Sequence, residues 1–288
     1  KLRKIRKQIS LVTDFVSCTG TALTKGRFFC YYAVMSSFIT LLCIFGMISL
    51  PSLANIFAYP VSHKLSLSIS NYIVTSCAHR LFSVMNCYKR FRFFAYREND
   101  RELPENFIVI SNHQSLFDIP AYMNYFRDWK TVRFVAKDTL SRHIPLVSEM
   151  LRSQEHCMIP RKARPMEAMK YLEEFGKRCV ERNQVPVLFP EGTRTKDGNV
   201  GKFATAGFRR LAESTGLPVV VCVLDGGYGI RDLKKIMSNL NNGSYRVKVL
   251  KVFDNPKNKE EAQKVLDEAK ILMENQLKEW RTKPADMR

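Results

Sequence analysis

Two stretches of the sequence place reactive side chains directly after apolar, strand-like segments. In the first, Phe107–Pro120, the apolar run ends at Ser111 and is followed by Asn112 and His113. The carboxyl ends of strands are a usual place for ligand sites in α/β sheets. A histidine at such a turn can serve as a general base, because an imidazole exchanges its proton near neutral pH. The stretch therefore predicts proton-transfer chemistry at His113.

Asp118 follows His113 by five residues and is the predicted partner of the imidazole. On a regular helix this spacing would turn the two side chains about 140° apart. They can meet only if His113 lies before the helix that contains Asp118. The carboxylate would then accept a hydrogen bond from one ring nitrogen and leave the other free as the base. By itself, a His-x-x-x-x-Asp pattern also fits a solvated loop histidine.

The second stretch, Val185–Arg194, leads from an apolar run into Pro190, Glu191, Gly192, Thr193 and Arg194. Gly192 permits a tight turn with exposed backbone N–H groups, and the planar guanidinium of Arg194 suits a phosphate. A solvated β-turn is the alternative interpretation of this segment. Because both stretches follow strands, we expect them to open on the same edge of one sheet.

From about Asn99 onward, short apolar strands alternate with helical stretches. The predicted strands are Phe107–Ser111, Val132–Lys137, Cys157–Arg161, Val185–Phe189, Pro218–Leu224 and Tyr245–Phe253. The predicted helices are Leu116–Phe126, Thr139–Arg152, Pro165–Arg182, Phe203–Thr215, Arg231–Leu240 and Lys259–Trp280. This alternation predicts an α/β fold, a layered sheet with flanking helices. The last strand alternates apolar and cationic residues, which favours a place at the edge of the sheet.

The first third of the chain has the features of a membrane anchor. Phe28–His63 contains no Lys, Arg, Asp or Glu, and roughly 20 apolar residues suffice to cross a bilayer core. A buried helix of a soluble protein is the weaker alternative. We therefore predict an N-terminal, hydrophobic helical membrane-anchoring segment at residues 1–97, followed by a catalytic α/β domain at residues 98–288.

How this segment meets the membrane is open between a full span and a re-entrant or monotopic helical hairpin. Basic residues lie on both sides of the charge-free run, and Lys and Arg accumulate on the cytoplasmic side of membranes. The hairpin is favoured, with Pro51 breaking the run into arms at Phe28–Leu50 and Ser52–His63. The aromatic and cationic residues of Lys64–Arg97 suit the headgroup layer. We expect a membrane-associated protein whose catalytic domain lies on the cytoplasmic face.

Composition narrows the choice of partners. The net charge is +19, and the first 97 residues hold 13 Lys and Arg against one acid, Asp14. Such a surface suits anionic lipid or nucleic acid, and the apolar run favours lipid, so no nucleic-acid partner is predicted. The eight cysteines form no C-x-x-C pair and are read as small buried hydrophobic residues in a reducing compartment. His156-Cys157 lacks a second ligand pair, so no metal site is predicted.

In order and spacing, four blocks of the sequence resemble the glycerolipid acyltransferase family, whose members include lysophosphatidic acid acyltransferases. The blocks are Asn112–Asp118, the pair Lys137 and Arg161, Pro190–Arg194, and Leu217–Val221. The resemblance extends over roughly Asn106–Leu224. An order of four blocks is far more specific than any one of them.

The resemblance implies a function and a role for each block. His113 would take the proton of a lysolipid hydroxyl, and Asp118 would orient the imidazole. Lys137, Arg161 and Arg194 would hold the acceptor phosphate, Glu191, Gly192 and Thr193 would line the same pocket, and Leu217–Val221 would form part of the acyl-binding wall. The implied reaction esterifies the sn-2 hydroxyl of 1-acyl-glycerol-3-phosphate to phosphatidic acid. The co-substrate is acyl-CoA or acyl carrier protein, and no cofactor is implied.

Three departures from the family pattern leave the acceptor open. Arg152–His156 stands where the family often has glycine, Lys202–Gly207 lacks paired lysines, and Cys222 replaces a frequent proline. Another lysophospholipid or glycerol-3-phosphate is therefore the alternative acceptor. A non-catalytic membrane protein that binds anionic lipid is the alternative outside enzymes. Oligomeric state is not specified by the sequence.

Overall fold

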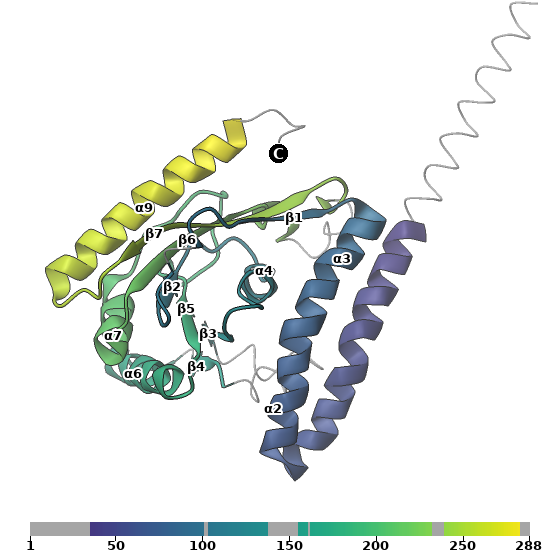
Figure 1. Cartoon of the computed structure of the whole chain (residues 1–288), viewed down its shortest axis with the longest axis horizontal. Helices are drawn as coiled ribbons and strands as arrows, with labels where there is room; N and C mark the ends of the chain where they lie inside the picture. The colour runs from purple at the N-terminus through teal and green to yellow at the C-terminus, as the bar shows by residue number, and fades with distance from the viewer. Residues whose placement is uncertain (1–34, 101–102, 138–154, 161, 232–238, 283–288) are drawn as a thin grey trace, which may run out of the picture.

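The computed structural model describes residues 35–100, 103–137, 155–160, 162–231 and 239–282. These residues form a seven-stranded sheet with helices on both faces, and a long helical hairpin lies beside it (Figure 1). The strands are β1 (Arg92–Tyr96), β2 (Ile108–Ile110), β3 (Val132–Lys137), β4 (Cys157–Ile159), β5 (Val185–Leu188), β6 (Val219–Asp225) and β7 (Ser244–Phe253). The predicted layered α/β fold is confirmed.

The strand order is β1-β7-β6-β2-β5-β3-β4, and only the β6–β7 pair is antiparallel. β2 lies in the middle, between β5 and β6, so the loop that follows it lies at the centre of the end of the sheet where the parallel strands finish. Its side chains alternate between two cores, with Val109 on one side and Ile108 and Ile110 on the other. This period of two is the geometry of a strand covered on both faces.

Helices cover the two faces unequally (Figure 1). On one face lie α6 (Pro165–Glu181), α7 (Thr205–Thr215) and α9 (Lys259–Thr282), which share a core with Ile108 and Ile110. On the other lie α4 (Asp118–Tyr125) and the hairpin, which share a core with Val109. These helices agree with the predicted ones. The predicted helix Thr139–Arg152 lies outside the described residues, as does most of Arg231–Leu240, which follows the short 3₁₀ helix η4 (Tyr228–Ile230).

The prediction of an edge position for the last strand was wrong, because β7 is paired on both sides. The edge is β1, whose residues the sequence had assigned to the membrane headgroup layer. Two of the β7 cations contact α9 instead, and a third, Lys248, pairs with Glu98 at 2.9 Å. Buried Arg246 lies over the ring of Trp280 and donates to its carbonyl oxygen at 3.1 Å, and Lys251 pairs with Glu268. The alternation of apolar and cationic residues on β7 therefore arises largely from polar contacts with α9.

The hairpin consists of the Met35–Val61 helix and an antiparallel arm of α2 (His63–Tyr72), the π-helical turn η1 (Ile73–Cys77) and α3 (Ala78–Lys89). Ser62 caps α2 by accepting a hydrogen bond from Leu65 N. Only Arg90 and Phe91 separate α3 from β1, and Arg90 adopts the left-handed conformation (φ 53°) that ends the helix. The second arm therefore continues directly into the sheet.

The predicted break at Pro51 was wrong, because the Met35–Val61 helix passes through it. Proline lacks an N–H and leaves the carbonyl four residues earlier without its helical partner. That carbonyl belongs to Met47, and the Cys77 thiol of the other arm donates to it at 3.7 Å. The turn of the hairpin falls at Ser62 instead.

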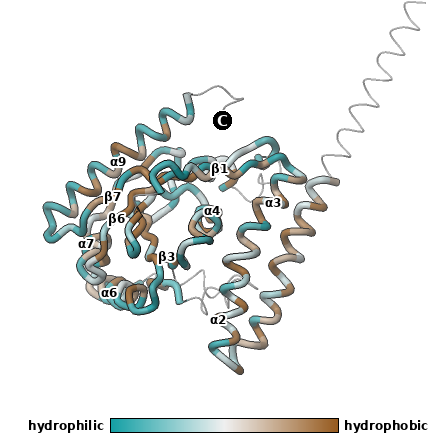
Figure 2. Tube along the Cα trace, viewed as in Figure 1, coloured by the Kyte–Doolittle hydropathy of each residue, from teal (hydrophilic) through white to brown (hydrophobic). Residues whose placement is uncertain are grey.

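Polar side chains hold the two arms together along a buried seam. Asn55 accepts from Ser66 at 2.7 Å and donates to Ser70 at 3.2 Å. Lys89 is buried and donates to Ser36 at 3.2 Å and Ser37 at 2.6 Å. Burial lowers the pKa of its ammonium group. The outer side of the Met35–Val61 helix is apolar, and in Figure 2 this helix is largely brown and white.

Cysteine placement follows the expectation of small buried hydrophobic residues at most described positions. The six described cysteines are all free, and Cys77, Cys157, Cys179 and Cys222 are buried. Burial is the main cause that raises the pKa of each of these four thiols. They are therefore protonated packing residues, and Cys87 is exposed.

Candidate active site

The loop between β2 and α4 brings His113 and Asp118 into contact. His113 lies in the loop, and Asp118 is the first residue of α4, so the histidine precedes the helix as the spacing requires. The Nδ1 atom of His113 lies 2.6 Å from Oδ2 of Asp118. Because Asp118 accepts, Nδ1 carries the proton and Nε2 is left as an acceptor.

Four donors hold the Asp118 carboxylate, which is fully buried. Its Oδ2 atom also accepts from the backbone N–H of Gln114 at 2.6 Å and of Ser115 at 3.0 Å. Its Oδ1 atom accepts from the hydroxyl of Tyr245 on β7. Buried carboxylates require such partners, since an unpaired one is costly. The carboxylate therefore has one fixed position behind the imidazole.

The imidazole of His113 is held flat against Phe189, with ring centroids 4.2 Å apart and planes 13° apart. Its side chain is 15% exposed, and it lines a cavity of about 660 Å³. None of the described residues bonds to Nε2. The free nitrogen is thus available to a molecule in the cavity.

Two amide side chains fix the loop that contains His113. Asn112 forms a pair of hydrogen bonds with the backbone of Leu224 on β6, at 2.9 and 3.0 Å. Gln114 donates to Asp225 at 3.1 Å and accepts from Tyr228 N at 3.1 Å. The loop is therefore tied to the neighbouring strand and to the turn that follows it.

Glu191 has a different place from the one implied by the resemblance. It does not line the cavity but faces inward, where Oε1 accepts from His113 N at 2.8 Å and Oε2 accepts from Gly201 N at 3.0 Å. Burial raises the pKa of its carboxyl, and the two backbone donors oppose that rise. The side chain joins the two loops of the site, and a direct contact of Glu191 with substrate stays a prediction.

The other residues of that turn do line the cavity. Gly192 adopts φ 63° and donates to Phe189 O at 3.0 Å, a conformation that suits glycine. Thr193 and Arg194 follow on the exposed side and border the same space. Thr195 N donates to His113 O at 2.8 Å, which fixes the turn against the dyad loop.

The second block ends at the same sheet edge. Lys137 is the last residue of β3 and stands opposite Ile159 of β4 in the parallel register. Arg161 lies outside the described residues. Nearby residues of both strands, Val135, Ala136, Ile159 and Pro160, border the cavity. The backbone thus brings the end of β3, with Lys137, to the end of the sheet where the cavity lies.

The body of the cavity is apolar and lies between the sheet and two helices. Leu172 of α6 and Gly207 and Phe208 of α7 line it, together with Leu188 of β5. The predicted wall residues of the fourth block do not border it: Val219 and Val221 are fully buried in the core. β6 is an interior strand of the sheet, so its apolar side chains pack into the core on both faces and do not face the cavity. The sequence missed Leu172 and Phe208 because their helical pattern indicates only a core face.

Among known proteins, residues 95–225 match the family model described as Acyltransferase. Over 119 residues the chain is 34% identical to a 1-acyl-sn-glycerol-3-phosphate acyltransferase of Cocos nucifera, covering 41% of this chain and 37% of the relative. Over 120 residues it is 30% identical to the enzyme of that name from Pseudomonas aeruginosa, covering 42% and 44%. The chain thus spans less than half of these curated relatives.

A solved structure extends the likeness of the fold. The crystal structure of the 1-acyl-sn-glycerophosphate acyltransferase from Thermotoga maritima superposes with a TM-score of 0.63. The superposition covers 88% of this chain and 99% of that one, at 20% sequence identity. The resemblance inferred from the four blocks is confirmed by the Acyltransferase family model that residues 95–225 match and by the names of the curated relatives.

Proposed function

We propose that this chain transfers an acyl group from acyl-CoA or acyl carrier protein to the sn-2 hydroxyl of 1-acyl-glycerol-3-phosphate, giving phosphatidic acid. The observation that carries the proposal is the position of His113, whose free ring nitrogen adjoins a cavity that has Arg194 at its rim and an apolar body. The rim suits a phosphate, and the body suits an acyl chain. The names of the curated relatives point to the same reaction.

In this mechanism Nε2 of His113 accepts the proton of the lysolipid hydroxyl as its oxygen attacks the thioester carbonyl. The new C–O bond forms and the C–S bond breaks, and the imidazolium returns the proton to the departing thiolate. Asp118, 2.6 Å from Nδ1, offsets the positive charge that develops on the ring. No covalent enzyme intermediate is needed. Alignment of the two reactants can lower the activation barrier by roughly 7–11 kcal/mol.

The acceptor preference is tested by assaying labelled acyl-CoA with 1-acyl-glycerol-3-phosphate, lysophosphatidylcholine, glycerol-3-phosphate and the uncharged monoacylglycerol. Arg194→Ala is expected to raise KM for the phosphate monoester roughly ten- to hundredfold, because a charge-assisted hydrogen bond is lost. Its KM for monoacylglycerol should stay within twofold.

Lys196→Ala is the matched control, an exposed cation two positions away that does not line the cavity. It should behave as the unmodified protein with every acceptor. Equal losses in the two variants would show a general field effect and contradict a phosphate contact at Arg194. If no lysolipid is acylated with either donor, the proposed function is wrong.

We also propose that the outer face of the Met35–Val61 helix lies in the membrane. This helix is long and apolar enough to span a bilayer. Its polar residues face the other arm, whereas Phe38, Phe45 and Phe57 are 62%, 64% and 73% exposed. Apolar outside and polar inside is the reverse of a soluble hairpin, and lipid is the solvent that fits it.

Attachment in the plane of the interface is favoured over a span. The second arm packs along the first and contains Arg80 between its two ends, a cation that would enter the hydrocarbon layer if the hairpin crossed it. The Nε2 atom of His63, at the turn, lies 3.4 Å from a carboxylate oxygen of Glu155 in the α/β domain. The hairpin therefore lies along the domain, with one long side free for lipid.

Serine at positions 38, 45 and 57 together is expected to shift most of the protein from pelleted anionic vesicles to the supernatant, since about 25 cal/mol is lost per Å² of apolar contact. Ile271→Ser is the control, because Ile271 is 57% exposed on α9, away from the hairpin. Undiminished pelleting of the triple variant would contradict the proposed face.

A further inference from the structure

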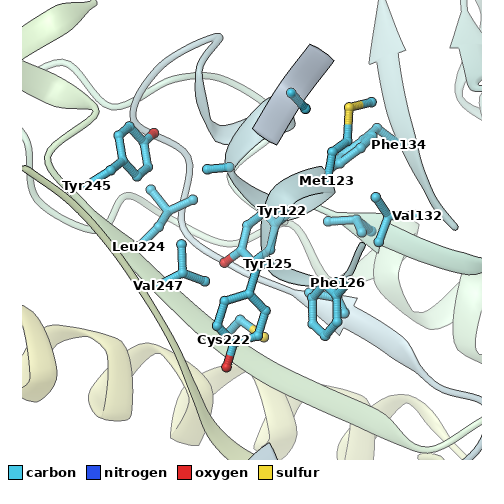
Figure 3. Close-up of a cluster of buried hydrophobic side chains, with 14 of the residues drawn as sticks. Tyr122, Met123, Tyr125, Phe126, Val132, Phe134, Cys222, Leu224, Tyr245 and Val247 are labelled. Carbon is cyan, nitrogen blue, oxygen red and sulfur yellow. The ribbon is translucent and has the colours of Figure 1, made fainter. Parts of the chain in front are cut away.

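Tyr245 lies on the face of the sheet opposite α9, next to Asp118 of the dyad. Its hydroxyl forms a hydrogen bond in addition to the packing of its ring. It is fully buried on β7 and lies in one cluster with Tyr122 and Tyr125 (Figure 3). Its hydroxyl donates to Oδ1 of Asp118, the oxygen that does not contact His113. One carboxylate therefore joins the two side chains, with the imidazole on one oxygen and the phenol on the other.

The surroundings prevent this hydroxyl from turning elsewhere. The side chain of Ser115 forms a hydrogen bond with it, and burial together with the charge of Asp118 holds the pKa of the phenol well above its usual range. The phenol is therefore always a donor to Asp118. Gly227 closes the remaining side: a Cβ there would lie 2.5 Å from the Tyr245 hydroxyl and 2.9 Å from Oδ1 of Asp118.

We propose that Tyr245 is a positioning residue for the dyad, which fixes the rotation of the Asp118 carboxylate and shares its negative charge. This inference rests on the proposed acyl transfer and deepens it. Without the phenol, Oδ1 loses its side-chain donor among the described residues, and that donor opposes rotation of the carboxylate away from Nδ1. The charge on the carboxylate is then also less shared, so it stabilises the imidazolium form of His113 more strongly.

Tyr245→Phe keeps the ring contacts with Phe82 and Phe91 and removes only the hydroxyl. We expect kcat to fall about tenfold with KM within twofold, because the defect concerns the base and leaves the cavity intact. The acidic limb of the pH–rate profile should move to higher pH by several tenths of a unit. The titration midpoint of His113, followed by NMR of its ring carbons, should move in the same direction.

Tyr125→Phe is the matched control. The hydroxyl of Tyr125 donates to Asp100 at 2.6 Å, so this variant also deletes a buried phenol–carboxylate bond. In Figure 3 the hydroxyls of Tyr125 and Tyr245 point to opposite sides of the cluster. It should lower the melting temperature to a similar degree and leave kcat and the His113 midpoint unchanged. Gly227→Ala, which pushes the same phenol, should reproduce the effects of Tyr245→Phe.

The outcomes separate this inference from the proposed function. An active unmodified protein whose Tyr245→Phe variant keeps kcat and the His113 midpoint overturns the inference and leaves the function standing. Equal losses of kcat in the two tyrosine variants, with no change of midpoint, overturn it as well. A protein that acylates no acceptor refutes the function, and the NMR midpoint then still decides whether Tyr245 tunes the dyad.

Discussion

Replacing His113 with alanine is expected to lower the rate of acyl transfer by about a thousandfold, while the protein stays folded and attached to membranes. General-base catalysis contributes roughly 10²–10⁴-fold, and no other described imidazole lines the cavity. The variant loses the stacking on Phe189 and one of the four donors to Asp118, and the other three donors remain. Release of label from acyl-CoA into lysolipid measures the rate, and vesicle pelleting measures attachment.

His79→Ala is the control for this variant. His79 bonds to Asn124 of α4 at 3.0 Å and lies outside the cavity, so its loss should leave turnover within a few-fold. An unchanged rate in His113→Ala would contradict the assignment of the base. A protein that binds anionic vesicles but shows no turnover in any form would instead favour the non-catalytic alternative.

Asp118→Asn is expected to reduce kcat by about a thousandfold or more with little change of KM. Losing the carboxylate of the Ser-His-Asp triad costs about 10⁴-fold, and here the imidazole would lose the negative charge that stabilises its protonated form. The amide oxygen can still accept from the backbone N–H groups of Gln114 and Ser115. The amide NH₂ then faces Tyr245, whose hydroxyl can accept, so the fold should survive.

Asp100→Asn is a control of matched chemistry. Asp100 is also buried, and it accepts from Tyr125 at 2.6 Å and Arg97 at 3.1 Å, outside the dyad. Its replacement should lower the melting temperature and leave kcat nearly unchanged. If the two variants lost the same fraction of activity, burial of any carboxylate would explain the result and the role of Asp118 would fail.

The dyad could be predicted because its geometry is local. Asn112 and His113 follow a buried strand, and Asp118 begins the next helix, so chain direction alone brings them together. Tyr245 could not be predicted, since 127 residues separate it from Asp118. The contact forms because β7 pairs with β6 in the sheet, and this pairing is determined only when the whole sheet assembles. The same holds for β1, whose cations and aromatic residues resemble those of a membrane surface.

The direction in which a side chain faces was also beyond the sequence. Glu191 and Arg194 lie in the same turn, yet one faces inward to two backbone amides and the other borders the cavity. A motif identifies the turn and does not distinguish these two environments. His156 is similar: it accepts from Phe134 N in the core, where burial lowers its pKa to about 3. It is a neutral packing residue.

Pro51 shows why a local rule failed. The rule treats a helix alone, where an unpaired carbonyl is a cost of roughly 3 kcal/mol or more together with the steric clash. In the hairpin, Cys77 supplies a donor from the opposite arm. The compensation comes from residues far along the chain, so only the packed pair of helices could reveal it.

The two-residue link between α3 and β1 leaves no flexible linker between the hairpin, the proposed membrane anchor, and the α/β domain. An enzyme tethered by a loose linker would sample many heights above a bilayer, and its encounter with substrate would depend on chance orientation. With the hairpin attached to lipid as proposed, this short connection would hold the His113 imidazole at a fixed height above the membrane. A lysolipid, the proposed acceptor, rests at a depth set by its own chain and headgroup, and the imidazole would have to be presented at that depth.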